Sequence, residues 1–169
     1  MKDVLAEVDG LAFCHTRIEY LDLVLSIEKA NSDFVFMWPK ERHVEAIHRL
    51  DEMHISIVNV ASREFVGYMI LAGIGGEDLA LEFRRLVIAD KGKGYGRTSI
   101  KFVKEYCFGL LKYHRLWLDV YTDNERAVDL YRSEGFVQEG LLRECKKHGD
   151  GYRSMLIMSM LESEYAELR

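Results

Sequence analysis

The sequence predicts a mixed α/β or α+β fold, in which one mixed sheet packs against several helices. Segments with the two-residue periodicity of strands alternate with segments whose apolar residues recur at helical spacing. The chain contains one proline, Pro39, and no linker, repeat or low-complexity tract marks a domain boundary. We therefore expect residues 1–169 to form a single domain, a length sufficient to bury a core.

The first part of the chain predicts one strand followed by two helices. Residues 11–16 are strand-like, and residues 18–30 place apolar side chains along one helical stripe. The stripe consists of Ile18, Leu21, Val24, Leu25 and Ile27. Pro39 suits the first turn of a second helix, in which Val44, Ile47 and Leu50 recur at helical spacing.

From residue 54 onwards, strands dominate the pattern. The expected strands are 54–60, 65–73, 80–89, 115–121, about 136–144 and 152–161. Two helices interrupt them, at 94–112 and 123–134. The inward residues expected in the first of these helices are Ile100, Val103, Cys107, Leu110 and Leu111.

Composition and charge narrow the class of protein. Hydrophobic residues make up 49% of the chain, and no stretch approaches the roughly 18 apolar residues that span a bilayer. Asp3, Glu7 and Asp9 occupy the region where a secretory signal would be apolar, so we expect a cytoplasmic protein without a membrane partner. The net charge of −5 argues against nucleic acid as a partner and suits a cationic small molecule or a basic peptide.

The cysteines and histidines predict neither a disulfide framework nor a metal site. The three cysteines are isolated from one another and odd in number. His43 and His48 are five residues apart, which does not place two ligands on one helical face as a four-residue spacing would. We expect no metal cofactor.

The glycine-rich segment from Asp90 to Thr98 lies between an apolar strand and an amphipathic helix. Its glycines allow a tight turn, and the following helix N-terminus offers unpaired amides to an anion. Basic residues gather here, namely Lys91, Lys93, Arg97, Lys101 and Lys104. Glycine spacing alone leaves open whether this is a phosphate site or a turn with solvated lysines. The segment is neither a GxxxxGK[ST] loop nor a GxGxxG fingerprint.

Residues 86–106 resemble the strand–loop–helix signature of the GCN5-related N-acetyltransferase (GNAT) superfamily, whose core pattern is Arg/Gln-x-x-Gly-x-Gly/Ala. Lys91 to Gly96 match it, with Lys91 in the Arg/Gln position. The resemblance implies acetyl-CoA as co-substrate, with its pantetheine arm along Leu86, Val87 and Ile88. The implied pyrophosphate-binding residues are Lys91, Gly92, Lys93, Gly94, Tyr95, Gly96, Arg97 and Thr98.

A second part of the same resemblance covers residues 120–136. By local rules alone this is a short helix: Thr122, Asp123 and Asn124 all suit an N-cap, Thr122 with Glu125 fits a capping box, and a left-handed C-cap is expected at residue 135. The family pattern V-x-x-x-N-x-x-A-x-x-L-Y-x-x-x-G-F also matches it.

The resemblance gives three residues of this helix a role in the reaction. It implies that Asn124 hydrogen-bonds the pantetheine region and that Ala127 leaves room for it. It also implies that Tyr131 protonates the departing thiolate as general acid. The alternative for Tyr131 is a half-buried helix tyrosine without a catalytic role.

A general base is needed because a free amine is mostly protonated near neutral pH. Glu82 is the candidate, since it lies four residues before Leu86 on the same strand, where many relatives in the superfamily carry an acid. The alternative is an exposed strand carboxylate paired with Arg84 or Arg85. A backbone N–H near Val87 is expected to meet the oxyanion. The loop acids Glu77 and Asp78 could instead attract a cationic amine.

The resemblance extends over residues 54–162. Within the superfamily, this part of the chain is most similar to the branch that holds ribosomal-protein alanine N-acetyltransferases and spermidine N-acetyltransferases. The residues that carry it are Gly135-Phe136, Glu139-Gly140 and Gly149-Asp150-Gly151-Tyr152. It implies a mostly antiparallel mixed sheet of about seven strands, splayed between the fourth and fifth, with helices on both faces. It also leaves a homodimer possible.

The implied activity is transfer of an acetyl group from acetyl-CoA to a primary amine by direct attack on the thioester. A polyamine, a peptide or protein N-terminus, or a small-molecule amine such as an aminoglycoside would each serve as acceptor. The alternative is a non-catalytic coenzyme A-binding sensor or regulatory module of the same fold. A nucleotide-binding module is a weaker rival.

Overall fold

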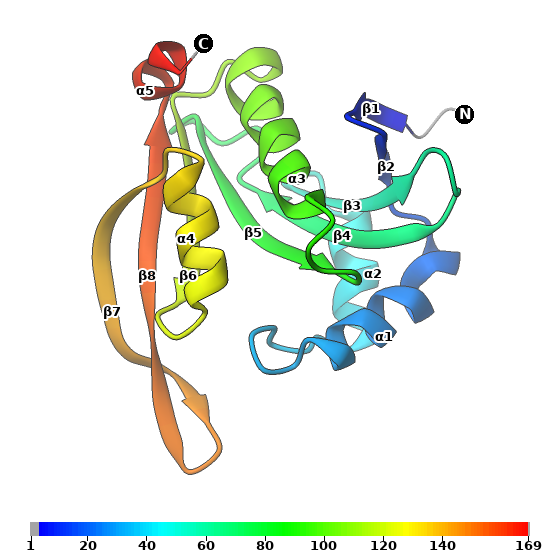
Figure 1. Ribbon diagram of the computed structural model, residues 1–169, viewed down its shortest axis with the longest axis horizontal. Coiled ribbons are helices and arrows are strands. Elements are labelled where there is room, and N and C mark those ends of the chain that lie inside the picture. The colour runs from blue at the N-terminus through cyan, green and yellow to red at the C-terminus, as the bar shows by residue number, and fades with distance from the viewer. Residues whose placement is uncertain (1–3, 169) are drawn as a thin grey trace.

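An eight-stranded mixed sheet organises the computed structural model, which describes residues 4–168. The strands lie in the order β1-β2-β3-β4-β5-β6-β8-β7, and neighbours are antiparallel except for the parallel pair β5–β6 (Figure 1). Their bounds are β1 Val4–Val8, β2 Leu11–His15, β3 Glu52–Asn59, β4 Phe65–Ala72, β5 Ala80–Ile88, β6 Arg115–Tyr121, β7 Val137–His148 and β8 Gly151–Leu161. The mixed α/β prediction is confirmed; residues 1–3 and 169 of the expected domain lie outside the described part.

The predicted sheet of about seven strands lacked β1, which pairs with β2 at the edge of the sheet. The two strands are joined by Asp9 and Gly10, whose φ angles of 46° and 80° are left-handed. Asp-Gly is favoured in two-residue hairpin turns for this reason. The strand, Val-Leu-Ala-Glu-Val, is apolar in sequence, but as the edge strand it has only exposed and half-buried residues.

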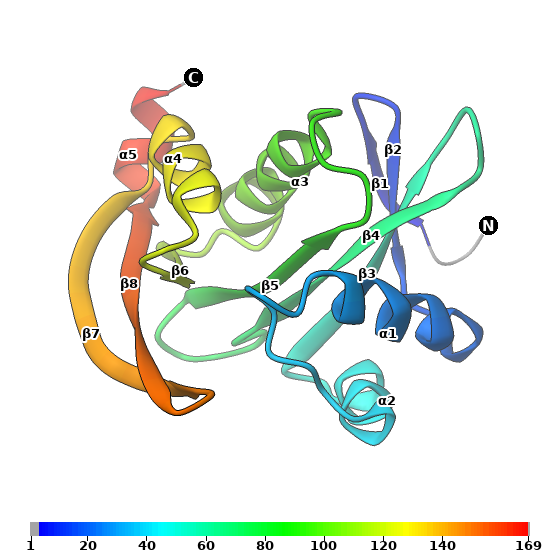
Figure 2. The same ribbon diagram turned by 60° about the horizontal axis from the view of Figure 1, so that its bottom comes forward.

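Helices cover both faces of the sheet, as predicted. The helices are α1 Leu21–Ala30, α2 Lys40–His48, α3 Tyr95–Lys104, α4 Glu125–Ser133 and α5 Glu162–Glu167. A 3₁₀ turn, η1 (Ile18–Tyr20), precedes α1, and a π-helical turn, η2 (Glu105–Leu110), extends α3. Helices α1 and α2 lie on one face, and α3 and α4 on the other (Figures 1 and 2). Within residues 4–168, no helix is long and apolar enough to cross a bilayer.

The alternation of β4 divides the core into two layers. Met69 and Leu71 belong to the apolar cluster that includes α3, whereas Tyr68 and Ile70 belong to the cluster that includes α1. Successive strand residues point to opposite faces, so one strand serves both layers.

Three apolar residues predicted to face the core are instead exposed. Leu50, 94% exposed, lies beyond α2, because the backbone becomes extended at Arg49 to enter β3. Leu110, 69% exposed, ends the π-helical turn, whose wider winding breaks the 3.6-residue spacing assumed for 94–112. Ile18, 50% exposed, lies in the 3₁₀ turn before α1 and does not share its buried stripe.

The sheet is splayed between β5 and β6, which are the fourth and fifth predicted strands. Their parallel ladder covers only Ala80–Glu82 and Arg115–Trp117. Beyond this point the two strands separate, as Figure 2 shows. A β-bulge accompanies the splay, because the register of β5 on β4 passes from Phe83 to Arg85 and leaves Arg84 as the extra residue.

A buried carboxylate fastens α1 to the sheet next to this splay. Glu28 is fully buried and accepts hydrogen bonds from Tyr68 Oη and Arg85 Nη1. His43 Nε2 lies 3.3 Å from Glu28 Oε1. Burial alone would raise the pKa of Glu28, but contacts with His43 and Tyr68 and the charge of Arg85 hold this pKa below its ordinary value.

Replacing Glu28 should therefore be far more destabilising than replacing an exposed acid of the same helix. Glu28→Gln leaves the Arg85 charge without its buried partner, and we expect the free energy of unfolding to fall by about 3 kcal/mol. Asp22→Asn is the matched control, because the Asp22 side chain is 82% exposed and its pair with Lys40 contributes at most about 1 kcal/mol. Urea denaturation measures both, and equal losses would contradict the assignment of Glu28 as the fastening residue.

Candidate active site

A cavity of about 330 Å³ lies where β5 and β6 separate. Its aromatic lining consists of Phe34, Phe36, Trp38, Phe83, Tyr121 and Tyr131. Its charged lining consists of Glu82, Arg84, Arg85, Asp119 and Lys146. The cavity also brings together five residues predicted from the sequence, namely Glu82, Leu86, Asn124, Ala127 and Tyr131. Leu86 and Glu82 come from β5, and the other three from α4 and its N-cap.

The glycine-rich loop forms the turn from β5 into α3. Gly92 and Gly94 have left-handed φ angles of 89° and 80°, and Gly94 is the N-cap of α3. The space that a Cβ would occupy at either glycine is open, with no heavy atom of the described residues within 4 Å. Gly96 packs against α4, because a Cβ there would lie 3.2 Å from Leu130 Cδ2. The loop can therefore bring backbone N–H groups close to a phosphate.

The basic residues around this loop are mostly neutralised by acids of the same chain. Lys93 pairs with Asp90 at 2.8 Å, and Lys101 pairs with Asp9 at 2.9 Å. Arg97 and Lys104 both pair with Glu134. The positive charge expected from the sequence is thus largely compensated, and the anion-binding capacity of the loop rests on its backbone amides and on the helix dipole.

Strand β5 presents an unpaired edge to the cavity. The ladder with β6 ends at Glu82, so the stretch from Phe83 to Ile88 is hydrogen-bonded only to β4 among the described strands. Leu86 lines the cavity, whereas Val87 is buried in the layer under α1. An extended chain such as pantetheine can pair with the free edge as a further strand would.

Helix α4 begins at Asn124, whose side chain accepts a hydrogen bond from Ala127 N at 3.4 Å. The capping box suggested for Thr122 and Glu125 is therefore wrong: Thr122 lies outside the helix, and its hydroxyl donates to Ser154 O. Asn124 also lines the cavity, and since its carbonyl oxygen makes the cap, its amide nitrogen is the group left as a donor. Gly135 has a φ of 91°, as expected for a left-handed C-cap.

Tyr131 is half-buried on α4, with its ring against those of Phe83 and Phe136 at centroid distances of 6.4 and 5.7 Å. Burial and then the charge of Asp119 raise the pKa of Tyr131. The hydroxyl therefore stays protonated at neutral pH and can donate a proton into the cavity.

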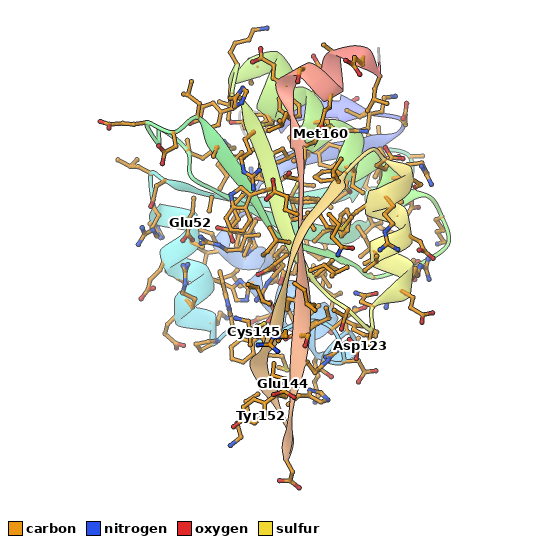
Figure 3. All side chains as sticks on the ribbon, turned by 90° about the vertical axis from the view of Figure 1, so that its left-hand side faces the viewer. Glu52, Asp123, Glu144, Cys145, Tyr152 and Met160 are labelled. Carbon is orange, nitrogen blue, oxygen red and sulfur yellow. The ribbon has the colours of Figure 1, made fainter. Side chains whose placement is uncertain are left out.

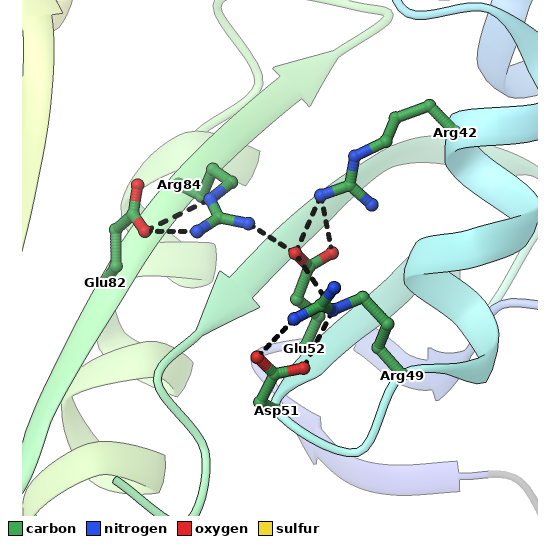
Figure 4. A network of polar contacts seen from close by, with 6 residues as sticks. All are labelled: Arg42, Arg49, Asp51, Glu52, Glu82 and Arg84. Atoms are coloured by element: carbon green, nitrogen blue, oxygen red, sulfur yellow. Dashed lines mark hydrogen bonds and ion pairs between the residues drawn. The ribbon is translucent and has the colours of Figure 1, made fainter.

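Glu82 is bound by Arg84. The sequence left this ion pair open as the alternative to a general base. Arg84 donates to Glu82 Oε2 from Nη2 at 2.6 Å and from Nε at 3.1 Å. The same guanidinium reaches Glu52 at 2.6 Å, and Glu52 also binds Arg42 at 2.7 Å. Figure 4 shows this network, which ties β5 to β3 and α2. A catalytic role for Glu82 stays a prediction.

Asp119 is a second carboxylate of the cavity and was not singled out from the sequence. Burial raises the pKa of Asp119, and the neighbouring charge of Glu82 raises it further, while Lys146 and Arg84 oppose the shift. In β6 it lies on the face opposite to the buried Leu118 and Val120. The sequence offered one signal for Asp119, namely an acid on the less buried face of a strand. The sequence does not show that this strand pairs in parallel with the strand of Glu82, so that Asp119 and Glu82 line one cavity. Glu77 and Asp78, by contrast, do not line it.

Comparisons with known proteins agree with this geometry. A family model described as the acetyltransferase (GNAT) family matches residues 25–136. The chain is 30% identical over 146 residues to a spermidine N(1)-acetyltransferase of Vibrio cholerae serotype O1, covering 80% of this chain and 84% of that protein.

Two solved structures of spermidine N-acetyltransferase from Vibrio cholerae are also similar. One, in complex with CoA and spermine, has a TM-score of 0.82 at 27% identity and covers 93% of this chain and 98% of that chain. The other is dodecameric and has a TM-score of 0.79 at 26% identity, covering 92% and 96%.

The glycine assignment predicts a specific loss in coenzyme binding. Gly94→Val places a side chain on the path of the phosphates and strains a φ of 80°, so we expect the Kd for acetyl-CoA to rise about tenfold or more, as for the loss of one charge-assisted hydrogen bond. Gly10→Val is the matched control, because Gly10 has the same φ and open space but lies in the β1–β2 turn. Calorimetric titration measures both variants, and an unchanged Kd for Gly94→Val would contradict the assignment.

Proposed function

The chain belongs to the acetyltransferase (GNAT) family and is an acetyl-CoA-dependent N-acetyltransferase, and we propose that residues 1–169 form one domain that acetylates a primary amine in the cavity between β5 and β6. The observation that carries the proposal is the convergence of Tyr131, Asp119 and Glu82 on one cavity beside the free edge of β5.

Acetyl-CoA supplies an activated thioester, and this chain's residues suit its parts. In the proposal, the amides of Lys91 to Thr98 bind the pyrophosphate, and their fit rests on the open space at Gly92 and Gly94. The backbone of Leu86, Val87 and Ile88 pairs with the pantetheine arm along the unpaired edge of β5. The amide of Asn124 adds a hydrogen bond, and the small side chain of Ala127 leaves room beside it.

The proposed chemistry is direct transfer with two proton movements. The neutral amine attacks the carbonyl carbon, so that a C–N bond forms and the C–S bond then breaks. A carboxylate of the cavity takes the proton that the amine loses, and Tyr131 donates its proton to the departing thiolate. The backbone N–H near Val87 donates to the oxyanion, as predicted from the sequence.

We propose Asp119 as the general base, with Glu82 as the alternative. Both oxygens of Glu52 and one oxygen of Glu82 are already committed to arginines, whereas Asp119 forms no ion pair within the described part of the chain. A raised pKa also makes Asp119 a stronger base than an ordinary aspartate.

The non-catalytic module is the less favoured alternative. An ion pair at Glu82 and a Tyr131 turned away from the cavity would both have supported it. Glu82 is paired, but Tyr131 lines the cavity and Asp119 offers a base that does not depend on Glu82. Spermidine is the acceptor named for the relatives, so it belongs in every acceptor panel.

Assembly and location are two further parts of the proposal. A homo-oligomer is proposed because a similar structure is dodecameric. We also propose a cytoplasmic location, the one expected from the sequence.

Thiol release from acetyl-CoA with a panel of amines (spermidine, an aminoglycoside, N-terminal peptides) tests the activity, and Tyr131→Phe tests its mechanism. We expect kcat to fall about a hundredfold, since the variant lacks the proton donor, while the Kd for acetyl-CoA stays unchanged. Tyr20→Phe is the control, because its ring packs on Phe65 away from the cavity. Equal kcat values for wild type and Tyr131→Phe would remove Tyr131 from the mechanism.

The two carboxylates are separated by pH profiles. Activity should be lost as pH falls through the pKa of Asp119, which lies above the ordinary aspartate value, because the protonated acid cannot accept a proton. Glu82→Gln removes a charge that raises this pKa, so the acid limb of kcat should move to lower pH with activity retained. Asp119→Asn should lower kcat about a hundredfold. The opposite pattern, with loss on Glu82→Gln alone, would assign the base to Glu82.

A further inference from the structure

A second hollow of about 200 Å³, here called the outer hollow, adjoins the cavity on the far side of segment 32–37. Val35, Phe36 and Tyr121 line both spaces. In the inference drawn below, one elongated molecule follows these shared residues from the cavity to the outer hollow. Since the carboxylates and Tyr131 lie in the cavity, the outer hollow is placed to receive the part of an acceptor that does not react.

The segment between the two spaces is held from both sides of the splay. Arg85 of β5 donates from Nη2 to Phe36 O at 2.7 Å. Arg153 of β8 donates to Asp33 O, and its guanidinium lies 3.9 Å from the ring centroid of Tyr121. A second guanidinium nitrogen of Arg153 pairs with Asp123 at 2.6 Å. The outer hollow thus has a wall that is fixed before any acceptor binds.

A distortion of the β7–β8 hairpin supplies the basic side chains of this region. Between the pairs Leu142–Met155 and Lys146–Arg153, three residues of β7 oppose one of β8, and Glu144 has a left-handed φ of 49°. Figure 3 shows Cys145 on this arm at about the level of Asp123, with Glu144 below it. Beyond the bulge, Lys146 lines the cavity and Lys147 lines the outer hollow. Bulges near active sites commonly redirect side chains in this way.

The charge of the outer hollow is positive, in contrast to the acidic chain as a whole. Its lining contains Lys147, His148 and Arg153 and no acidic side chain. Arg153 is compensated by Asp123, but within residues 4–168 neither Lys146 nor Lys147 takes part in an ion pair. Arg84 and Arg85 are already bound to Glu82, Glu52 and Glu28. The charges beside the acceptor path that form no ion pair in the described chain are therefore the two lysines and Asp119. Lys146 lies in the cavity and lowers the pKa of Asp119, whereas Lys147 faces the outer hollow.

We propose that the outer hollow binds an anionic group of the acceptor, so that the preferred acceptor is an amine that carries carboxylates, such as a peptide with acidic residues after its N-terminus. This inference rests on the proposed function. The amine lies beside Asp119, and a carboxylate a few bonds away lies against Lys147 and Arg153. A linear polyamine would place its second ammonium group against Lys147, where like charges repel.

Three C-terminally amidated peptides test the proposal against spermidine. They share an N-terminal alanine, followed by two glutamates, two glutamines or two lysines. We expect kcat/KM to decrease in the order glutamate, glutamine, lysine, with about a tenfold difference between the ends of the series, as for a partly exposed charge contact. Spermidine should be no better than the lysine peptide. A spermidine or lysine-peptide kcat/KM above that of the glutamate peptide would overturn this inference while leaving the proposed function intact.

A charge reversal supplies the matched control. Lys147→Glu should invert the order of the peptides, and Lys147→Gln should flatten it. Arg143→Glu makes the same change of charge on the same exposed strand but lines neither space, so it should preserve the order. Equal effects of Lys147→Glu and Arg143→Glu would overturn the proposal, because net charge alone would then explain the preference. Failure of every amine to release thiol would contradict the proposed function itself, and this inference with it.

Discussion

The short parallel ladder between β5 and β6 is the constraint on which the rest of the structure depends. Only Ala80–Glu82 and Arg115–Trp117 are paired, so the sheet is continuous at one end and open at the other. The open end exposes the backbone edge of β5 and creates the cavity. It also makes room for α4 to bring Tyr131 opposite that edge. A longer ladder would close the cavity and leave the glycine loop as an isolated anion site.

Charges around the splay are arranged so that few remain uncompensated. Glu28 holds Arg85 beneath the α1 layer, and Glu52 and Glu82 hold Arg84 at the cavity wall. Asp119 lies among these pairs without an ion pair of its own in the described chain, and burial raises its pKa. A partly buried acid without an ion pair is costly to a fold, which is the reason that such groups mark functional sites.

Local signals were enough to predict most of the framework from the sequence. The loop around Gly92 and Gly94, the α4 helix and the approximate strand positions follow from glycine, capping and periodicity. Asp9-Gly10 and the apolar run Val4–Val8 beside it carried the signal for β1, which the sequence prediction missed. Asp119 could not be assigned, because its neighbours depend on the register of two strands about 35 residues apart in sequence. The bulge at Glu144 precedes Lys146 and Lys147, which line the two spaces. It could not be predicted, because the residue with the left-handed φ angle is a glutamate and not a glycine.

The central claim is that coenzyme A lies in the splay, with its pantetheine arm on the β5 edge and its sulfur beside Tyr131. A crystal structure of the complex with coenzyme A measures this directly. The account predicts hydrogen bonds from the pantetheine amides to the backbone of Leu86–Ile88 and a sulfur within about 4 Å of Tyr131 Oη, the reach of a hydrogen bond to sulfur. Coenzyme A bound away from the β5 edge, or a sulfur remote from Tyr131, would contradict it.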